Sequence, residues 1–237
     1  MTDLDSLSAQ DIAGRLAGSP EERTALVRTG AEAGVAEAQA VWGQMLLDRG
    51  DSRAAFGWFN KAAAQHHVMA LNMVGRCYDL GWGVDVDKAR AAACFRIAAE
   101  AGLSEGMYNH ATALALGAGV AEDRTAALAW LEKAAATGNA KAVNFIGSFH
   151  EDGWVVARDM GRAADLYARA AEGGDFRGAF NHARMRIDAG DLAGALTWIE
   201  RSGAWGNARF RGQAATWLAA SPLGLEGVAA LERGAAC

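Results

Sequence analysis

Proline, long apolar runs and blocks of positive charge are scarce or absent in this sequence. Its 237 residues include two prolines, Pro20 and Pro222, and each follows a serine. Proline interrupts helices from within, so its scarcity favours a helical protein, and each Ser-Pro pair is typical of a helix start with serine as the N-cap. No apolar run reaches the roughly 18 residues of a membrane-spanning helix, and no membrane insertion is expected.

Positive charge is not concentrated anywhere along the chain. The 23 Lys and Arg residues are mixed with 28 Asp and Glu residues, for a formal net charge of −5. A chain without a basic block has no electrostatic footprint for nucleic acid, so nucleic acid is not expected as a partner. The amino-terminal segment MTDLDSLSAQ lacks the basic and apolar regions of a secretory signal, and we expect a cytoplasmic protein.

Cysteines are too few for a disulfide framework. There are three, Cys77, Cys94 and Cys237, without paired spacing. A bridge between Cys77 and Cys94 is one interpretation, and two small core residues is the favoured one. Signatures of catalysis are also missing, because the sequence has no phosphate-binding loop, nucleophile elbow or H-E-x-x-H motif. We therefore expect no enzyme, no cofactor and no metal.

What the sequence does contain is a repeat with a constant period of 36 residues. The segment from Gly81 to Gly102 reads GWGVDVDKARAAACFRIAAEAG, and its pattern of glycine, valine, aspartate and alanine recurs from Gly117 to Gly138 and from Gly153 to Gly174. A fixed period in this range is typical of stacked-repeat proteins. Abundant alanine between regularly placed glycines predicts two helices, A and B, in each repeat.

Glycine and aspartate mark the expected ends of these helices. The first glycine of each copy can adopt positive φ and end helix A: Gly81, Gly117 and Gly153. The aspartate can cap the amino terminus of helix B: Asp87, Asp123 and Asp159. Ser19-Pro20-Glu21-Glu22 has the pattern of a capping box.

The pattern predicts an all-α fold of about seven antiparallel helix pairs. Helices A are expected at about 5–17, 35–49, 67–80, 103–116, 139–152, 175–189 and 206–219. Helices B are expected at about 20–32, 51–64, 87–100, 123–136, 159–172, 191–203 and 222–234.

Three motifs recur at the 36-residue period: A-x-x-x-[LVIH]-[GA], G-x-G-V-x-x-D and W-[FLI]-x-[KR]-A-A. Together they resemble Sel1-like repeats, which are relatives of tetratricopeptide repeats. The resemblance implies a right-handed α–α superhelix, a solenoid whose A helices line a concave groove. It divides the chain into a capping pair at 1–34, five repeats at 35–66, 67–102, 103–138, 139–174 and 175–206, and a second capping pair at 207–237.

The resemblance also implies a function, because such proteins bind other proteins or peptides and seldom catalyse. We expect a non-catalytic scaffold or adaptor for an unidentified protein or peptide. By analogy with tetratricopeptide repeats, the groove positions are Met69, Asn72, Arg76, Asp79, Glu105, Tyr108, Thr112, Lys141, Asn144, Ser148, Arg177, Phe180 and Arg184. Asparagine amides can pair with a peptide backbone, and arginine can bind a carboxylate with two hydrogen bonds. A solvated groove that only keeps the protein soluble is the alternative.

Other interpretations stay open. We expect a monomer, but an exposed apolar patch at Leu223, Leu225, Val228 and Leu231 would favour self-association. A hydrolase is the least favoured alternative, since it requires a pocket of acidic or histidine side chains with shifted pKa values. His110 and His182 share one repeat position and are predicted to lie in or near the core. The loop residues Trp82 and Trp154 are either packing or contact residues.

Overall fold

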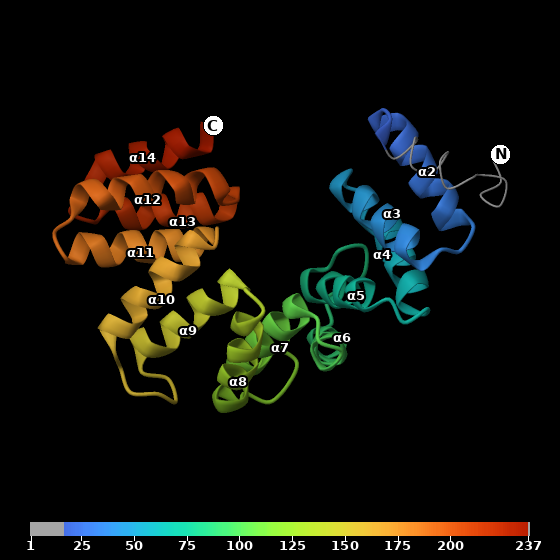
Figure 1. Ribbon diagram of the computed structural model, residues 1–237, viewed down its shortest axis with the longest axis horizontal. Helices are drawn as coiled ribbons and strands as arrows, with labels where there is room; N and C mark the ends of the chain where they lie inside the picture. The colour runs from blue at the N-terminus through green and yellow to red at the C-terminus, as the bar shows by residue number, and fades with distance from the viewer. Residues whose placement is uncertain (1–16, 237) are drawn as a thin grey trace. The chain divides into compact units, whose positions relative to one another are not determined.

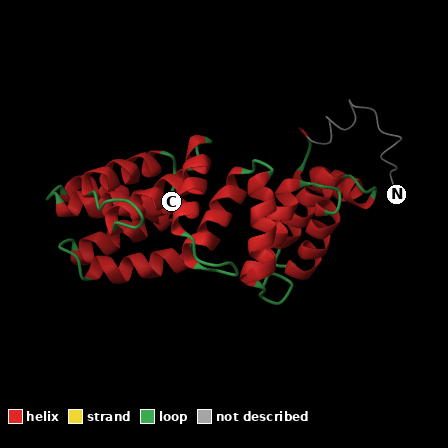
Figure 2. Ribbon diagram, turned by 90° about the horizontal axis from the view of Figure 1, so that it is seen from below, coloured by secondary structure: helices red, strands yellow, loops and turns green. Residues whose placement is uncertain are grey.

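The computed structural model describes residues 17–236, and all regular secondary structure in that range is helical (Figures 1 and 2). The all-α class and the arrangement in helix pairs are therefore confirmed. The predicted first helix at about 5–17 lies outside the described residues except for Ala17, and Cys237 lies outside them as well. Every other helix is found within two residues of its predicted ends.

The chain divides into two compact units, which we describe separately. Unit 1 ends at Glu122, and its helices are α2 (Pro20–Glu32), α3 (Ala36–Asp48), α4 (Ser52–Ala63), α5 (Val68–Leu80), α6 (Lys88–Glu100) and α7 (Ser104–Leu116). Each of these helices packs against the next one along the chain. The A helices of this unit are α3, α5 and α7.

Unit 2 begins at Asp123. Its helices are α8 (Arg124–Ala136), α9 (Ala140–Asp152), α10 (Met160–Glu172), α11 (Phe176–Asp188), α12 (Leu192–Trp205), α13 (Ala208–Ala219) and α14 (Gly224–Ala236). Helices α8 to α12 pack in chain order, and α14 then covers both α12 and α13. The A helices of this unit are α9, α11 and α13.

The predicted N-caps of the B helices and the predicted glycine ends of the A helices are confirmed. Each capping aspartate accepts a hydrogen bond from the backbone N–H three residues later, at 2.9, 2.9 and 2.8 Å for Asp87, Asp123 and Asp159. Each glycine that ends helix A has a positive φ, at 74°, 63° and 73° for Gly81, Gly117 and Gly153. These local interactions explain why the period alone located the helices.

One of the two Ser-Pro predictions is correct. Pro20 begins α2, Ser19 Oγ accepts from the Glu22 N–H at 3.2 Å, and the Glu22 carboxylate accepts from the Ser19 N–H at 2.8 Å. The prediction for Pro222 is wrong, because α14 begins only at Gly224. The Gly224 N–H donates to the Ser221 carbonyl at 3.0 Å, so Ser221-Pro222 forms a turn ahead of the helix.

The second glycine of the G-x-G loop has a role that the sequence analysis did not identify. A Cβ atom at Gly83 would lie 2.2 Å from the Ser52 carbonyl oxygen at the start of α4. At Gly119 it would lie 2.0 Å from the Lys88 carbonyl oxygen at the start of α6. Each loop thus packs directly on the backbone of the preceding B helix, which leaves no room for a side chain. In the third loop Val155 occupies this position, with a φ of 51°.

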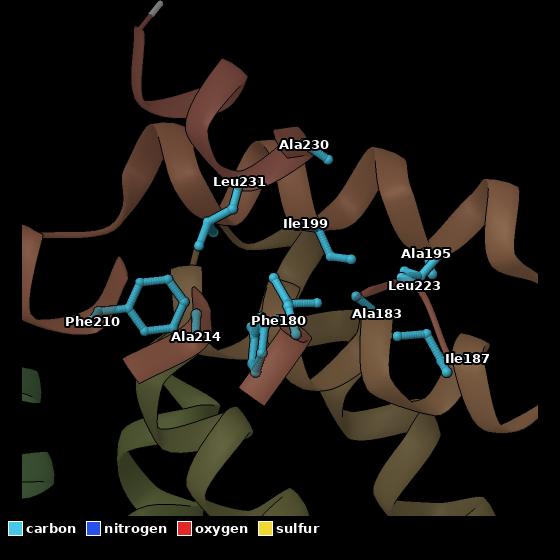
Figure 3. Packing of buried hydrophobic residues seen from close by; sticks show 11 residues of the cluster. Phe180, Ala183, Ile187, Ala195, Ile199, Phe210, Ala214, Leu223, Ala230 and Leu231 are labelled. Atoms are coloured by element: carbon cyan, nitrogen blue, oxygen red, sulfur yellow. The ribbon is translucent and has the colours of Figure 1, made fainter. Parts of the chain in front are cut away.

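A cluster of buried apolar residues on α11 to α14 forms one core of unit 2. Phe180, Ile199, Phe210 and Leu231 meet there from successive helices (Figure 3). Helices α12 and α14 approach closely because a Cβ at Gly203 would lie 2.1 Å from the Leu231 carbonyl oxygen. Unit 1 has a comparable cluster between α4 and α5, formed by Phe59 of α4 and by Met73, Val74 and Cys77 of α5.

Candidate functional site

Polar side chains of consecutive A helices form a connected network in unit 2. Asn181 Nδ2 donates to Asn144 Oδ1 at 2.9 Å, and Arg184 Nη1 donates to Asn181 Oδ1 at 3.0 Å. Arg184 Nη2 also donates to Glu151 Oε1 at 2.7 Å, and this ion pair is largely shielded from water. The network therefore fixes α11 against α9.

Tyr167 of α10 completes this network. Its hydroxyl donates to Glu151 Oε2 at 2.5 Å and lies 3.2 Å from Ser148 Oγ. Burial alone would raise the pKa of Glu151, but the hydrogen bonds from Tyr167 and Arg184 outweigh it and lower that pKa. Burial, together with the hydrogen bond to Glu151, raises the pKa of Tyr167. At neutral pH the site therefore holds an ionised Glu151 and a neutral Tyr167.

Unit 1 repeats the asparagine pair. Asn109 Nδ2 of α7 donates to Asn72 Oδ1 of α5 at 2.9 Å, and Asn109 follows Asn72 by the same 37 residues that separate Asn181 from Asn144. Asn72 and Asn144 are 2% and 8% exposed. Both amides thus link neighbouring A helices. The partners Asn109 and Asn181 were missed in the sequence, although their recurring spacing was a usable signal.

The predicted groove residues differ in how accessible they are. Three are buried: Asn72, Asn144 and Phe180. Six are half-buried: Arg76, Asp79, Tyr108, Thr112, Ser148 and Arg184. Four are exposed: Met69, Glu105, Lys141 and Arg177. Their role in binding a partner stays a prediction.

Aromatic rings adjoin the network of unit 2. Phe180 packs edge to face with Phe210 and with Trp217, at centroid distances of 5.7 and 5.5 Å. Trp217 of α13 is 39% exposed, and Arg184 Cζ lies 5.8 Å from its ring centroid. An accessible aromatic surface therefore lies beside the Arg184 cation. Trp217 was not among the predicted residues, because it falls in the irregular last repeat.

Arg76 of unit 1 has a different environment from Arg184. Its Cζ lies 4.7 Å from the ring centroid of Trp82, and its Nη1 lies 3.9 Å from Met73 Sδ. Burial lowers the pKa of Arg76, with Cys77 and Asp79 opposing that shift. The Asp79 carboxylate itself is paired with Lys88 Nζ at 2.6 Å.

The loop tryptophans are half-buried and pack inside their own units. Trp82 contacts the apolar cluster of unit 1, and Trp154 packs edge to face on Phe149 at 5.4 Å. Arg124, at the start of the neighbouring helix α8, places its Cζ 4.1 Å from the ring centroid of Trp154. These contacts favour the packing interpretation over an exposed contact edge.

The histidines at the shared repeat position lie in or near the core, as predicted. His110 is 6% exposed, and His182 is half-buried with its ring 5.3 Å from that of Trp198. Burial lowers the pKa of both imidazoles, and the nearby cations Arg96 and Arg186 add to the effect.

Neither a metal cluster nor a membrane span is found in the part of the chain that the structure describes. No group of three or more His, Cys, Asp or Glu side chains there is placed to hold a metal ion. No helix of residues 17–236 is both long and apolar enough to cross a membrane. Cys77 is buried, Cys94 is half-buried, and both are free thiols.

Comparison with known proteins identifies the repeats. The family model described as Sel1 repeat matches residues 36–67, 68–103, 104–139 and 140–175. No curated protein sequence matches the chain significantly. Apart from residue 175, the predicted fifth repeat at 175–206 and the two capping pairs lie outside the matched ranges, and they stay predictions.

Solved structures with the same fold include three Sel1-type proteins. A Sel1 repeat protein from Oxalobacter formigenes is 26% identical, with a TM-score of 0.66 over 84% of this chain and 59% of that one. The protective antigen c5321 of uropathogenic Escherichia coli is 26% identical, with a TM-score of 0.62 over 92% of this chain and 49% of that one. A putative Sel1 repeat protein from Klebsiella pneumoniae is 22% identical, with a TM-score of 0.57 over 77% of this chain and 93% of that one.

The chain thus spans 59% and 49% of the length of the first two of these structures. More than half of its own length, residues 36–175, is covered by consecutive matches to one family model. This chain belongs to the Sel1 repeat family.

Proposed function

We propose that the protein is a non-catalytic scaffold that binds a protein or peptide through its A helices. Helical repeats of the Sel1 and tetratricopeptide type are a general architecture for protein interaction. The observation that carries the proposal is a set of exposed side chains at one repeat position. Met69 and Glu105 of unit 1, and Lys141 and Arg177 of unit 2, are each the second residue of an A helix. We call these four equivalent repeat positions the recognition row.

The recognition row varies while its surroundings stay constant. The residue that follows it in each helix is small and buried: Ala70, Gly106, Ala142 and Gly178. The row itself carries an apolar, an acidic and two basic side chains, with Met69 42% exposed. A variable exposed position on a repeated scaffold gives each repeat its own contact chemistry, which is how a repeat protein can distinguish partners.

Two variants of matched size and charge test this proposal. The first replaces the whole recognition row with alanine. The control replaces four exposed residues of B helices with alanine and changes the net charge equally: Asn60, Arg96, Glu132 and Arg169. Immobilised wild type and both variants are exposed to lysate of the source cells, and bound proteins are identified by mass spectrometry.

We expect the wild type and the control to retain the same partner and the recognition-row variant to lose it. Circular dichroism melting should show that both variants remain folded, since all eight positions are exposed. Equal retention by the recognition-row variant would disprove the role of the A-helix surface.

Self-association is less well supported by the structure. Leu223 and Leu231, two of the four residues of the predicted apolar patch, are 6% and 1% exposed and belong to the core of unit 2. Leu225 is 84% exposed, but the buried Leu223 and Leu231 do not extend it into an exposed apolar patch. Sedimentation over a range of protein concentrations should give a constant mass if the protein is a monomer.

A further inference from the structure

Arg76 and Arg184 are the same residue of the repeat. Each is the ninth residue of its A helix, in α5 and α11 respectively. Each arginine is half-buried, and its guanidinium lies beside a tryptophan ring, Trp82 for Arg76 and Trp217 for Arg184. The two sites therefore share a cation and an aromatic neighbour, and they differ in what neutralises the charge.

The charge of Arg184 is neutralised within its own unit. Glu151, the twelfth residue of the preceding A helix α9, provides the carboxylate at 2.7 Å. Tyr167, the eighth residue of the intervening B helix α10, donates to the second carboxylate oxygen at 2.5 Å. The acid is thus both supplied and held in place by the repeat itself.

In unit 1 both of these positions are apolar. The twelfth residue of α3 is Leu47, and the eighth residue of α4 is Phe59. Leu47 packs against the apolar cluster of the unit, in which Phe59 is 1% exposed. At these positions unit 1 has neither the carboxylate nor the phenol that would hold it, while the arginine is present.

No other carboxylate of residues 17–236 takes the place of Glu151. Asp79 is the acid nearest in sequence on α5, and it forms its ion pair with Lys88. The guanidinium of Arg76 contacts the Trp82 ring and the Met73 sulfur, neither of which carries a negative charge. The Asp79 charge acts on Arg76 only through space, because that carboxylate is bonded to Lys88. A partly desolvated guanidinium with no carboxylate in hydrogen-bond contact is poorly compensated, and a planar carboxylate is the group that fits its paired N–H donors.

We propose that Arg76 binds an acidic side chain, Glu or Asp, of the peptide or protein that the scaffold recognises. This inference rests on the function proposed above. The side-chain carboxylate is favoured over a chain terminus because the internal counterpart is the side chain of Glu151. The ring of Trp82 covers the guanidinium while its N–H groups bind the acid. Burial, which lowers the pKa of Arg76, strengthens a hydrogen bond to an anion there.

The test uses the full chain, labelled with ¹⁵N, and follows the arginine Nε resonances by NMR. The probe is N-acetylglutamate N-methylamide, which offers one side-chain carboxylate, titrated at constant ionic strength. N-acetylglutamine N-methylamide is the neutral control, and N-acetylalanine provides a terminal carboxylate. We expect a saturable shift of the Arg76 resonance with the glutamate probe, at least threefold larger than with either other compound, and no comparable shift of Arg184.

Two variants make the result specific. Leu47→Glu places a carboxylate at the repeat position that Glu151 occupies in unit 2. This carboxylate should pair with Arg76 and so abolish the shift of the Arg76 resonance. Glu151→Gln should have the converse effect and make Arg184 respond to the probe. An Arg76 resonance that shifts no more than Arg184 in the wild type would overturn the proposal, as would an undiminished response in Leu47→Glu. A larger shift with N-acetylalanine would overturn the assignment to a side chain.

The same substitutions separate this inference from the proposed function. Once a partner is identified by the recognition-row experiment, Arg76→Gln should weaken its binding about tenfold, the loss of one charge-assisted contact. Unchanged binding by Arg76→Gln, with binding still lost in the recognition-row variant, would reject the acid site and leave the scaffold function intact.

Discussion

The guanidinium of Arg184 lies 2.7 Å from the carboxylate of Glu151, and this ion pair joins two consecutive A helices of unit 2. The two side chains are 26% and 19% exposed, so water and salt screen the pair less than a surface ion pair. The carboxylate has a second donor in Tyr167. These features make the pair a measurable contributor to the packing of α9 on α11.

A double-mutant cycle with Arg184→Ala and Glu151→Ala should therefore show a coupling energy of about 1–2 kcal/mol, as expected for residues in direct contact within one network. Urea unfolding of the wild type, the single variants and the double variant provides the four free energies. The exposed pair Arg96–Glu100, with side chains 52% exposed each, is the control. It should couple by less than about 0.5 kcal/mol, and equal coupling in the two cycles would contradict the prediction.

Acid should remove the contribution of Glu151. Its pKa is lowered in the folded state, so its stabilising effect is fully present above the unfolded pKa of about 4.3 and is lost as the pH falls through the folded pKa. The difference in unfolding free energy between the wild type and Glu151→Gln should be constant from about pH 7 to pH 5 and shrink below about pH 4. A difference that grows on acidification would show that the sign is wrong.

Asp175 should behave in the opposite way. It caps α11 by accepting from the Gly178 N–H at 2.8 Å, but it is 4% exposed and its Oδ1 has no hydrogen-bond partner. Burial raises the pKa of Asp175, so its ionisation lowers the free energy of unfolding at neutral pH. This loss of stability disappears as the pH falls through the folded pKa.

Asp175→Asn should therefore raise the unfolding free energy at pH 7 by about 1 kcal/mol, with a smaller gain at acidic pH. Asparagine suits the position, because Asn139 is the corresponding N-cap of α9 and accepts from the Ala142 N–H at 3.1 Å. Asp175→Ala is the control, since it removes the cap as well as the charge and should lose about 1 kcal/mol. Thermal melts at several pH values would reveal whether Asn is instead as harmful as Ala.

The third loop should gain stability from glycine. Val155 has a φ of 51°, which is strained for a β-branched residue, and its side chain is 53% exposed, so little packing is lost on truncation. We expect Val155→Gly to stabilise the protein by about 0.5–1 kcal/mol, after allowing for the greater flexibility of unfolded glycine.

The corresponding change in the first loop is predicted to have the reverse effect. Gly83→Val would place a Cβ atom 2.2 Å from the Ser52 carbonyl oxygen, and a loss of more than about 3 kcal/mol is expected from the clash and the positive φ. Chemical denaturation of both variants checks the pair. Val155→Gly at or below wild-type stability would show that the third loop is not strained.

The sequence was sufficient for helices and loops because their ends depend on local chemistry. Asp87 caps α6 and Gly81 ends α5 through bonds to residues only a few positions away, so a periodic pattern reveals them. The exception, Pro222, depends on the Ser221 turn, for which the terminal repeat offers no second copy to compare.

The candidate site was less predictable because it depends on how each A helix is rotated about its axis. Asn144 was assigned to the groove by analogy, yet it is 8% exposed and faces Asn181 of the next A helix. A rotation of one residue, about 100°, moves a side chain from a free face to a helix contact. The period of a repeat sets the helix spacing and leaves this rotation open. Arg184 was identified correctly as a polar A-helix residue, whereas its hydrogen bonds to Glu151 and Asn181 became apparent only from packing.

The close contact between each G-x-G loop and the preceding B helix has a consequence for synthesis on the ribosome. Gly83 packs on the start of α4, and Gly119 packs on the start of α6, so each loop docks onto backbone that was translated earlier. The backbone on which each loop packs is therefore already synthesised when the loop emerges. Unit 1 is suited to fold in the direction of translation, with each nascent repeat built on the one before it.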